Sequence, residues 1–284
     1  MKKLILSALV LGSLSLQAQK LDNSLLWKIS GKDLAKPSYL FGTIHMTCDA
    51  SLKESVKKAM DATSQLYLEL DMDDPSMQTK MMSGIMMKNG STLSSLCSAE
   101  DFKIVDEFLT KNIGYSAKLL NTVKPFFISA MLYPKMINCP MQSIENELMK
   151  LSKEQNEEIF GLESPEDQML VFDAIPYKDQ MNELIKTAKN NLENDKKEIQ
   201  KLLEVYKTED LNAMIELSRK SDNVISSKYE DDLLTKRNKN WISKITEVSK
   251  AKPTFFGVGA AHLGGENGVI MLLRKAGYKV EAVK

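Results

Sequence analysis

The chain of 284 residues is poor in the residue types that mark many common functions. It has three cysteines and two histidines, and its 38 basic and 38 acidic residues cancel to a formal charge of zero. Three cysteines are too few for a disulfide framework, and their spacing fits no zinc finger. Since no basic cluster is interleaved with aromatic residues, nucleic-acid binding has no support.

Several catalytic signatures are also missing. The sequence contains no Gly-x-Ser-x-Gly motif, no phosphate-binding loop and no dinucleotide fingerprint. Serine hydrolases, kinases and Rossmann enzymes are therefore disfavoured. The hydrophobic content of 43% is nevertheless sufficient for a proper core.

Residues 1–18 are typical of a secretory signal. Lys2 and Lys3 form a positive end, Leu4–Leu16 is apolar, and cleavage after Ala18 is plausible. The apolar stretch is shorter than the roughly 20 residues that span a bilayer, and no later segment is long and apolar enough. We therefore expect an exported, periplasmic or secreted protein without a transmembrane segment in its mature chain, and a single domain over residues 19–284.

The two ends of the chain repeat one pattern of strand, turn, helix and strand. The first copy is predicted at Tyr39–His45, Ser51–Thr63 and Gln65–Leu70, and the second at Thr254–Val258, Val269–Lys275 and Tyr278–Val283. Such βαβ units are almost always right-handed, with parallel strands. We predict an α/β (mixed α+β) fold with one mixed sheet, built from both units and from a hairpin strand at Leu25–Ser30.

Both histidines lie at the same point of this repeat, in Gly42-x-x-His45 and Gly259-x-x-His262. Glycine lets a backbone turn sharply or approach a ligand closely, and open α/β sheets bind ligands at the carboxyl ends of their strands. A single such histidine is most simply a hydrogen-bonded turn residue. Two in equivalent places indicate a shared site, where imidazoles can hold a metal or transfer protons.

Two glutamates follow other predicted strands. Glu69 ends the strand after the first helix, and Glu163 stands just before the helix that Ser164-Pro165 begins. If these strands are parallel, both carboxylates reach the same sheet edge as His45. The alternatives are a solvated edge carboxylate for Glu69 and a favourable helix-dipole interaction for Glu163.

Residues from about 75 to 250 are predicted to be a mostly helical insertion that covers the site as a lid or second lobe. Its longest predicted helix runs from Tyr177 to Tyr206, with one apolar and one charged face. No Gly-, Ser- or Pro-rich linker marks a domain boundary.

The paired Gly-x-x-His motifs, with Leu68-Glu69-Leu70 after the first and Gly161-Leu162-Glu163 between them, resemble the TraB/PrgY/GumN family. That family is related to the Tiki metalloproteases and, more distantly, to the erythromycin esterases. The resemblance extends from about Leu26 to Val283. It also matches Arg237-Asn238 to an Arg-Asn pair, which implies that Arg237 holds a substrate carboxylate or stabilises an oxyanion. A surface ion pair with Glu230 or Asp231 is the alternative.

Two functions follow from these residues and the resemblance. The first is a divalent-metal hydrolase acting on a peptide or ester bond, with His45 and His262 as ligands of Mn²⁺, Co²⁺ or Zn²⁺. Glu69 or Glu163 completes the ligand set, and the other acts as general base. The second is a non-catalytic protein that binds a peptide or a tetrapyrrole in the same pocket. The sequence leaves the oligomeric state open.

One disulfide and one free thiol is the natural count for three cysteines in an exported protein. Cys48 follows the first histidine loop, and Cys139 precedes a predicted helix at Ser143–Lys153. From these positions we predict a Cys48–Cys139 bridge that leaves Cys97 free.

Overall fold

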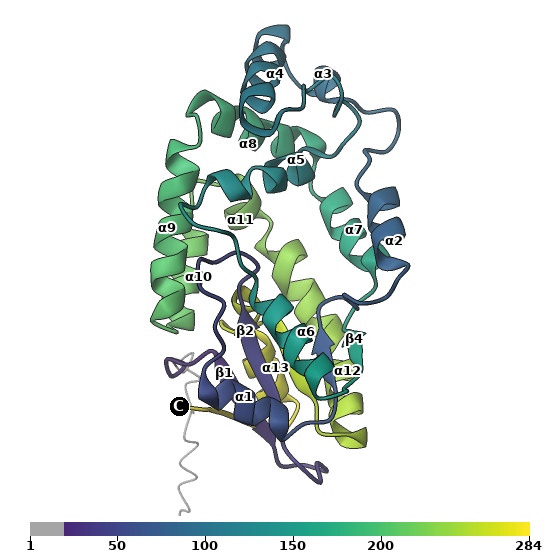
Figure 1. Ribbon diagram of the computed structural model, residues 1–284, viewed down its shortest axis with the longest axis vertical. Coiled ribbons are helices and arrows are strands. Elements are labelled where there is room, and N and C mark those ends of the chain that lie inside the picture. Colours follow the sequence, from purple (N-terminus) through teal and green to yellow (C-terminus); the bar gives the residue numbers. More distant parts are fainter. Residues whose placement is uncertain (1–19) are drawn as a thin grey trace, which may run out of the picture.

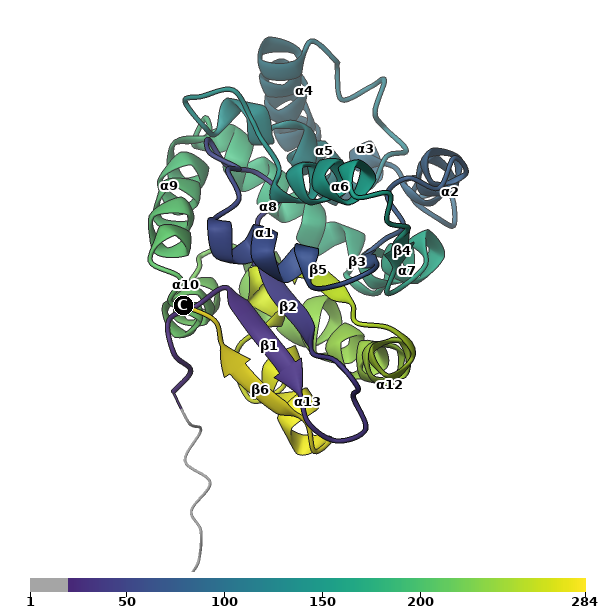
Figure 2. The ribbon, with the colours of Figure 1, turned by 60° about the horizontal axis from the view of Figure 1, so that its bottom comes forward.

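One six-stranded mixed sheet positions the site. The computed structural model describes residues 20–284, and the predicted signal at 1–18 lies outside this range. The strand order is β4-β3-β5-β2-β1-β6 (Figures 1 and 2). The strands are β1 Leu26–Ser30, β2 Ser38–Thr43, β3 Leu66–Leu68, β4 Ile159–Gly161, β5 Phe255–Gly259 and β6 Lys279–Ala282.

The sheet is parallel except for β1. Strand β5 pairs in parallel with both β2 and β3, β4 pairs in parallel with β3, and β1 runs antiparallel to β2 and β6. The predicted mixed sheet and its hairpin strand are therefore confirmed. Because β2 and β5 are direct neighbours, with Gly42 opposite Val258 and Thr43 opposite Gly259, both histidine turns begin at one sheet edge.

Helices cover both faces of the sheet. Helices α1 (Glu54–Asp61) and α6 (Ile144–Glu154) lie on one face, and α12 (Lys236–Ala251) and α13 (Val269–Lys275) lie on the other (Figure 2). Strands of such a sheet are buried on both faces and tend to be apolar throughout. This explains why β5, Phe-Phe-Gly-Val-Gly, is a continuous hydrophobic run rather than an alternating one.

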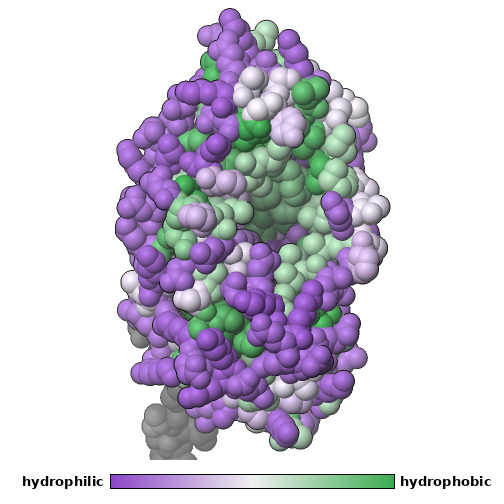
Figure 3. All heavy atoms as spheres, in the orientation of Figure 1, coloured by the Kyte–Doolittle hydropathy of each residue, from purple (hydrophilic) through white to green (hydrophobic). Residues whose placement is uncertain are grey.

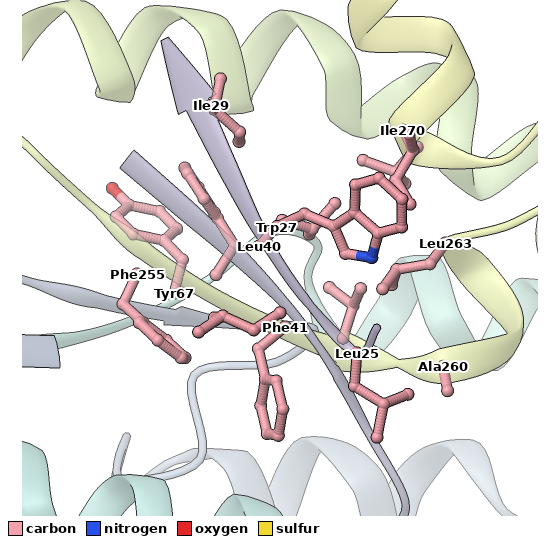
Figure 4. Close-up of a cluster of buried hydrophobic side chains, with 14 of the residues drawn as sticks. Leu25, Trp27, Ile29, Leu40, Phe41, Tyr67, Phe255, Ala260, Leu263 and Ile270 are labelled. Carbon is pink, nitrogen blue, oxygen red and sulfur yellow. The ribbon is translucent and has the colours of Figure 1, made fainter. Parts of the chain in front are cut away.

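The main core lies on both sides of the sheet. In Figure 4, Trp27 and Ile270 lie on one side of the strands and Phe41 on the other. Trp27, Phe255 and Ile270 are fully buried. The site is therefore built at the rim of a rigid, well-packed body.

A helical lobe rises from the carboxyl edge of the sheet and has an apolar cluster of its own (Figure 1). Its helices are α2 Met77–Gly84, α3 Leu93–Leu96, α4 Ala99–Ile113, α5 Pro125–Met131, α7 Pro165–Ala174 and α8 Tyr177–Lys189. Helices α9 (Glu193–Lys207), α10 (Leu211–Arg219) and α11 (Val224–Lys228), and a π-helical turn at Asp231–Thr235, return the chain to α12. The predicted helical insertion is thus present, and Figure 3 shows an apolar hollow in the face between lobe and sheet.

The prediction of one helix from Tyr177 to Tyr206 is wrong. Helix α8 ends at Lys189 and α9 begins at Glu193, because Asn191 and Leu192 have left-handed backbones with φ of 52° and 68°. Asparagine tolerates this conformation, whereas leucine is strained in it. Leu192 is buried in the lobe cluster, and this packing compensates for the strain.

No helix within residues 20–284 combines the length and the apolar character needed to cross a membrane.

Candidate functional site

His262 lies in a short 3₁₀ turn, Ala260–His262, directly after β5, and it is 4% exposed. The side-chain amide of Asn238 donates to the carbonyls of His262 and Asn267, so its Oδ1 is left to accept from Nδ1 of His262 at 2.6 Å. Arg237, which can only donate, lies with Nη1 3.1 Å from Nε2 of His262. Nε2 therefore presents a lone pair, and Nδ1 carries the proton.

Burial is the main reason that His262 stays neutral. It lowers the pKa of the imidazole to about 3, and the nearby charge of Arg237 acts in the same direction, against the attraction of Glu69. A neutral imidazole is the form that ligates metals and accepts protons.

Arg237 joins the two predicted glutamates. Its Nη2 lies 2.5 Å from Oε2 of Glu69 and 2.6 Å from Oε1 of Glu163, and all three side chains are nearly buried. The alternative partners do not pair with it: Glu230 instead pairs with Arg219, and no hydrogen bond or ion pair in the described range joins Asp231 to Arg237. Arg237 thus contacts three of the predicted site residues, Glu69, Glu163 and His262, rather than the surface carboxylates.

Glu69 is not a solvated edge carboxylate. Its Oε1 accepts a 2.8 Å hydrogen bond from the backbone N–H of Gly259 and lies 3.7 Å from Nε2 of His262. Burial alone would raise the pKa of this carboxyl, but attraction to His262, Arg237 and His45, with the Gly259 N–H, holds the pKa at about 2. Glu69 is therefore ionised across the physiological range.

Trp241 packs against the imidazole ring of His262. Its Nε1 donates to Oε2 of Glu163 at 3.0 Å, its ring lies 4.5 Å from the His262 ring, and Arg237 lies over it at 4.9 Å. Since α12 carries Arg237, Asn238 and Trp241, one helix orients most of the cluster.

His45 stands at the same edge but has a different partner. Its Nδ1 lies 2.6 Å from Oε1 of Glu145, and its side chain is 73% exposed. The hydrogen bond to Glu145 raises the pKa of His45 to about 9, although desolvation opposes it, and the charge of Glu69 adds to the rise. Within residues 20–284, no hydrogen bond or ion pair joins His45 directly to Glu69, Glu163 or His262.

The two motif glycines are favoured because a side chain at either position would crowd its neighbours, and not because their backbone conformation is one that only glycine adopts. A Cβ on Gly42 would come 3.1 Å from Ala260 and from Leu263, in the second histidine turn. A Cβ on Gly259 would come 3.3 Å from Oε1 of Glu69. Neither glycine has positive φ in the structure. Gly42 thus lets the two turns pack together, and Gly259 lets Glu69 reach the backbone.

The predicted disulfide between Cys48 and Cys139 is confirmed, with Cα atoms 5.6 Å apart, and Cys97 is free. The bridge ties the His45 loop to the segment that leads into α6. Sequence reasoning missed Glu145, which no motif marks. The one available signal was the predicted disulfide itself, because it places the segment after Cys139 beside His45.

The donors at this edge are of the right kind for a divalent cation. Imidazole nitrogens and carboxylates are common ligands of Zn²⁺, Mn²⁺ and Co²⁺. His45 contacts Glu145 through Nδ1, and Nε2 of His262 lies 3.7 Å from Oε1 of Glu69. No three His, Cys, Asp or Glu side chains between residues 20 and 284 are yet arranged as a ligand group. The Arg237 guanidinium contacts Nε2 of His262 at 3.1 Å and also both carboxylates. The donors therefore fit a cation in kind, and Arg237 at present engages three of them.

A sequence model described as the TraB/PrgY/gumN family matches residues 25–282. Among curated proteins, "Metalloprotease TIKI2" of Danio rerio is 23% identical over 93% of this chain and 62% of its own length. "Metalloprotease TIKI homolog" of Nematostella vectensis is 22% identical over 94% of this chain and 68% of its own length. The chain thus spans about three fifths of the zebrafish relative. No solved structure matches the chain significantly.

Proposed function

Because this chain belongs to the TraB/PrgY/gumN family, we propose that it is an exported hydrolase that uses a divalent metal ion to cleave a peptide or ester bond. The relatives named as metalloproteases support the reaction class. The observation that carries the proposal is the buried cluster of His262, Glu69, Glu163 and Arg237, at the sheet edge that also bears His45.

In this proposal His45 and His262 hold the metal through Nε2. Glu69 is the better candidate for the third ligand, since its Oε1 already lies 3.7 Å from Nε2 of His262. Two carboxylates against one guanidinium leave this cluster with a formal charge of −2 + 1 = −1, which favours a divalent cation. When bound, such an ion polarises a carbonyl group and lowers the pKa of water.

The remaining residues have roles of their own. Glu163 takes a proton from the attacking water once Arg237 releases one of its oxygens. Arg237 stabilises the negative charge that develops on the carbonyl oxygen. Asn238 and Trp241 keep the His262 ring in its present tautomer and orientation. The disulfide is consistent with an oxidising compartment, as export requires.

Metal analysis of the purified protein tests the proposal. We expect about one bound Mn²⁺, Co²⁺ or Zn²⁺ per chain in the wild type, and loss of that metal in His45→Ala with the fold intact. The substitution lies in an exposed loop and leaves little core cavity. Equal metal content in both proteins would refute the ligand assignment.

A binding protein without turnover is the second candidate. The apolar hollow between lobe and sheet favours it, because such a surface can hold a peptide without any chemistry (Figure 3). Tight binding of a peptide, without cleavage under any metal, would favour this candidate over the hydrolase.

A further inference from the structure

We infer that Glu145 is a positioning residue for His45: its carboxylate holds Nδ1 and so leaves Nε2 available to bind a ligand. The inference rests on the proposed function for its consequence, but its geometry is independent of any metal. No sequence motif marks Glu145.

The carboxylate of Glu145 is buried, so its charge must be compensated by hydrogen bonds. Its carboxylate is 8% exposed, in the first turn of α6. Oε1 accepts from Oγ1 of Thr43 at 2.6 Å and from Nδ1 of His45 at 2.6 Å, and Oε2 accepts from Oγ of Ser143 at 2.7 Å. An ionised carboxylate can only accept, so Nδ1 of His45 must be the donor. These bonds offset the cost of burying the charge.

His45 needs such a partner more than His262 does. The His262 ring is enclosed by Asn238, Arg237 and Trp241, whereas the His45 side chain is 73% exposed. Glu145 is its one ion-pair or hydrogen-bond partner within the described range. An imidazole without this bond would rotate freely and would pay the cost of ordering whenever it bound a ligand.

The position of Glu145 is itself secured from the same loop. Thr47 and Gln142 exchange two backbone hydrogen bonds of 3.0 and 2.9 Å, and the Gln142 side chain accepts from the backbone N–H of Ala50. The Cys48–Cys139 disulfide joins the same two segments. The segment that follows His45 is therefore cross-linked to the segment that precedes Glu145. This arrangement limits how far the two side chains can separate.

A structural role for Glu145 is the competing explanation, since a carboxylate in the first turn of a helix interacts favourably with the helix dipole. Glu147 is a matched control in the same turn of α6. Its side chain makes no hydrogen bond or ion pair in the described part of the chain. Removing its charge costs the dipole interaction without affecting His45.

The test compares Glu145→Gln, Glu145→Asp and Glu147→Gln by two measurements. The first is proton NMR of the metal-free protein, where an Nδ1 proton bonded to a buried carboxylate is shifted downfield and exchanges slowly. Only two histidines are present, and His262→Gln assigns their signals. The second is the dissociation constant for Co²⁺ and Zn²⁺ from direct titration.

We expect Glu145→Gln, whose amide oxygen is a weaker acceptor than a carboxylate, to move the Nδ1 signal of His45 upfield and to speed its exchange, and to leave the signal of His262 unchanged. This variant should bind metal 10- to 100-fold more weakly, the usual cost of weakening a group that orients a ligand. Glu145→Asp keeps the charge on a shorter side chain, and its metal affinity should lie between those of the wild type and Glu145→Gln. Glu147→Gln matches the wild type in both measurements. If Glu145→Gln does not fold, the aspartate variant supplies the comparison.

An Nδ1 signal of His45 that is unchanged in Glu145→Gln, or a metal affinity within threefold of the wild type, would overturn the inference. A wild-type protein that binds neither metal would refute the proposed function. In that event the NMR signal alone decides whether Glu145 positions His45.

Discussion

Arg237 and Glu163 are joined by three hydrogen bonds: Nε lies 3.1 Å from both carboxylate oxygens, and Nη2 lies 2.6 Å from Oε1. The same Nη2 reaches Glu69 at 2.5 Å. One guanidinium is thus shared by two nearly buried carboxylates, and neither carboxylate has another cation in direct contact within the described range. The stability of this cluster should therefore depend on Arg237.

Replacing Arg237 with methionine should lower the free energy of unfolding of the metal-free protein by about 3–5 kcal/mol, because it leaves buried charges unpaired. Urea denaturation measures the change. Arg219→Met is the matched control, since Arg219 pairs with Glu230 at an exposed position and should cost less than about 1 kcal/mol.

Added Zn²⁺ should recover more stability in Arg237→Met than in the wild type, because the cation replaces the lost positive charge and meets no competing guanidinium. Equal stabilisation of both proteins by the metal would show that Arg237 does not occupy the cation's position.

Stability should fall as the pH drops from about 6.5, mainly through His262. The folded-state pKa of His262 is about 3, below its usual 6.5. Between these two pH values the imidazole of His262 is therefore protonated in the unfolded chain but not in the folded protein. The stabilisation is fully present above pH 6.5 and is lost at up to roughly 1.4 kcal/mol per pH unit below it. Denaturation of wild type and His262→Gln at several pH values between 6.5 and 4.5 should show this slope in the wild type alone. A slope unchanged in the variant would contradict the neutral, buried state of His262.

The strands and their histidines could be predicted because local sequence determines them. Continuous apolar runs mark the parallel strands, and each Gly-x-x-His motif follows one of them. The register of β2 and β5 then brings both turns to one edge, as the repeated pattern implied. Glu69 and Glu163 follow from the same rule, since each comes at the end of a parallel strand.

Glu145 and the break at Asn191 could not be predicted in this way. Glu145 is brought to His45 by a contact between segments about 100 residues apart, and apart from the predicted disulfide at Cys139 no local pattern indicates that contact. The apolar stripe of α8 continues into α9, so periodicity alone indicates one helix. The left-handed Leu192 is stable only because the lobe buries it, and this is a property of tertiary packing.

The disulfide should contribute measurable stability because it closes a long loop. Its cysteines are separated by 91 residues, and the replacement of both Cys48 and Cys139 by alanine should cost about 2–5 kcal/mol in the free energy of unfolding. Cys97→Ala is the control, since that thiol is unbridged. A double variant as stable as the control would indicate that the bridge does not form in solution.

Metal affinity should rise with pH across the neutral range. His45 is protonated below its pKa of about 9 and must lose that proton to ligate a metal. The apparent affinity should therefore increase about tenfold per pH unit between pH 6 and 8. Isothermal titration in buffers of different ionisation enthalpy should detect the release of about one proton per metal. An affinity independent of pH would exclude His45 as a ligand.

The most direct test of the hydrolase proposal is the cleavage of a peptide library by the wild-type protein, first with chelator and then with Mn²⁺, Co²⁺ or Zn²⁺ restored. We predict that chelation abolishes cleavage, that one of these metals restores it, and that His45→Ala and His262→Ala stay inactive while remaining folded. Glu163→Gln should retain metal but lose at least 100-fold in rate. Cleavage that continues unchanged in the presence of chelator would contradict the metal-dependent mechanism.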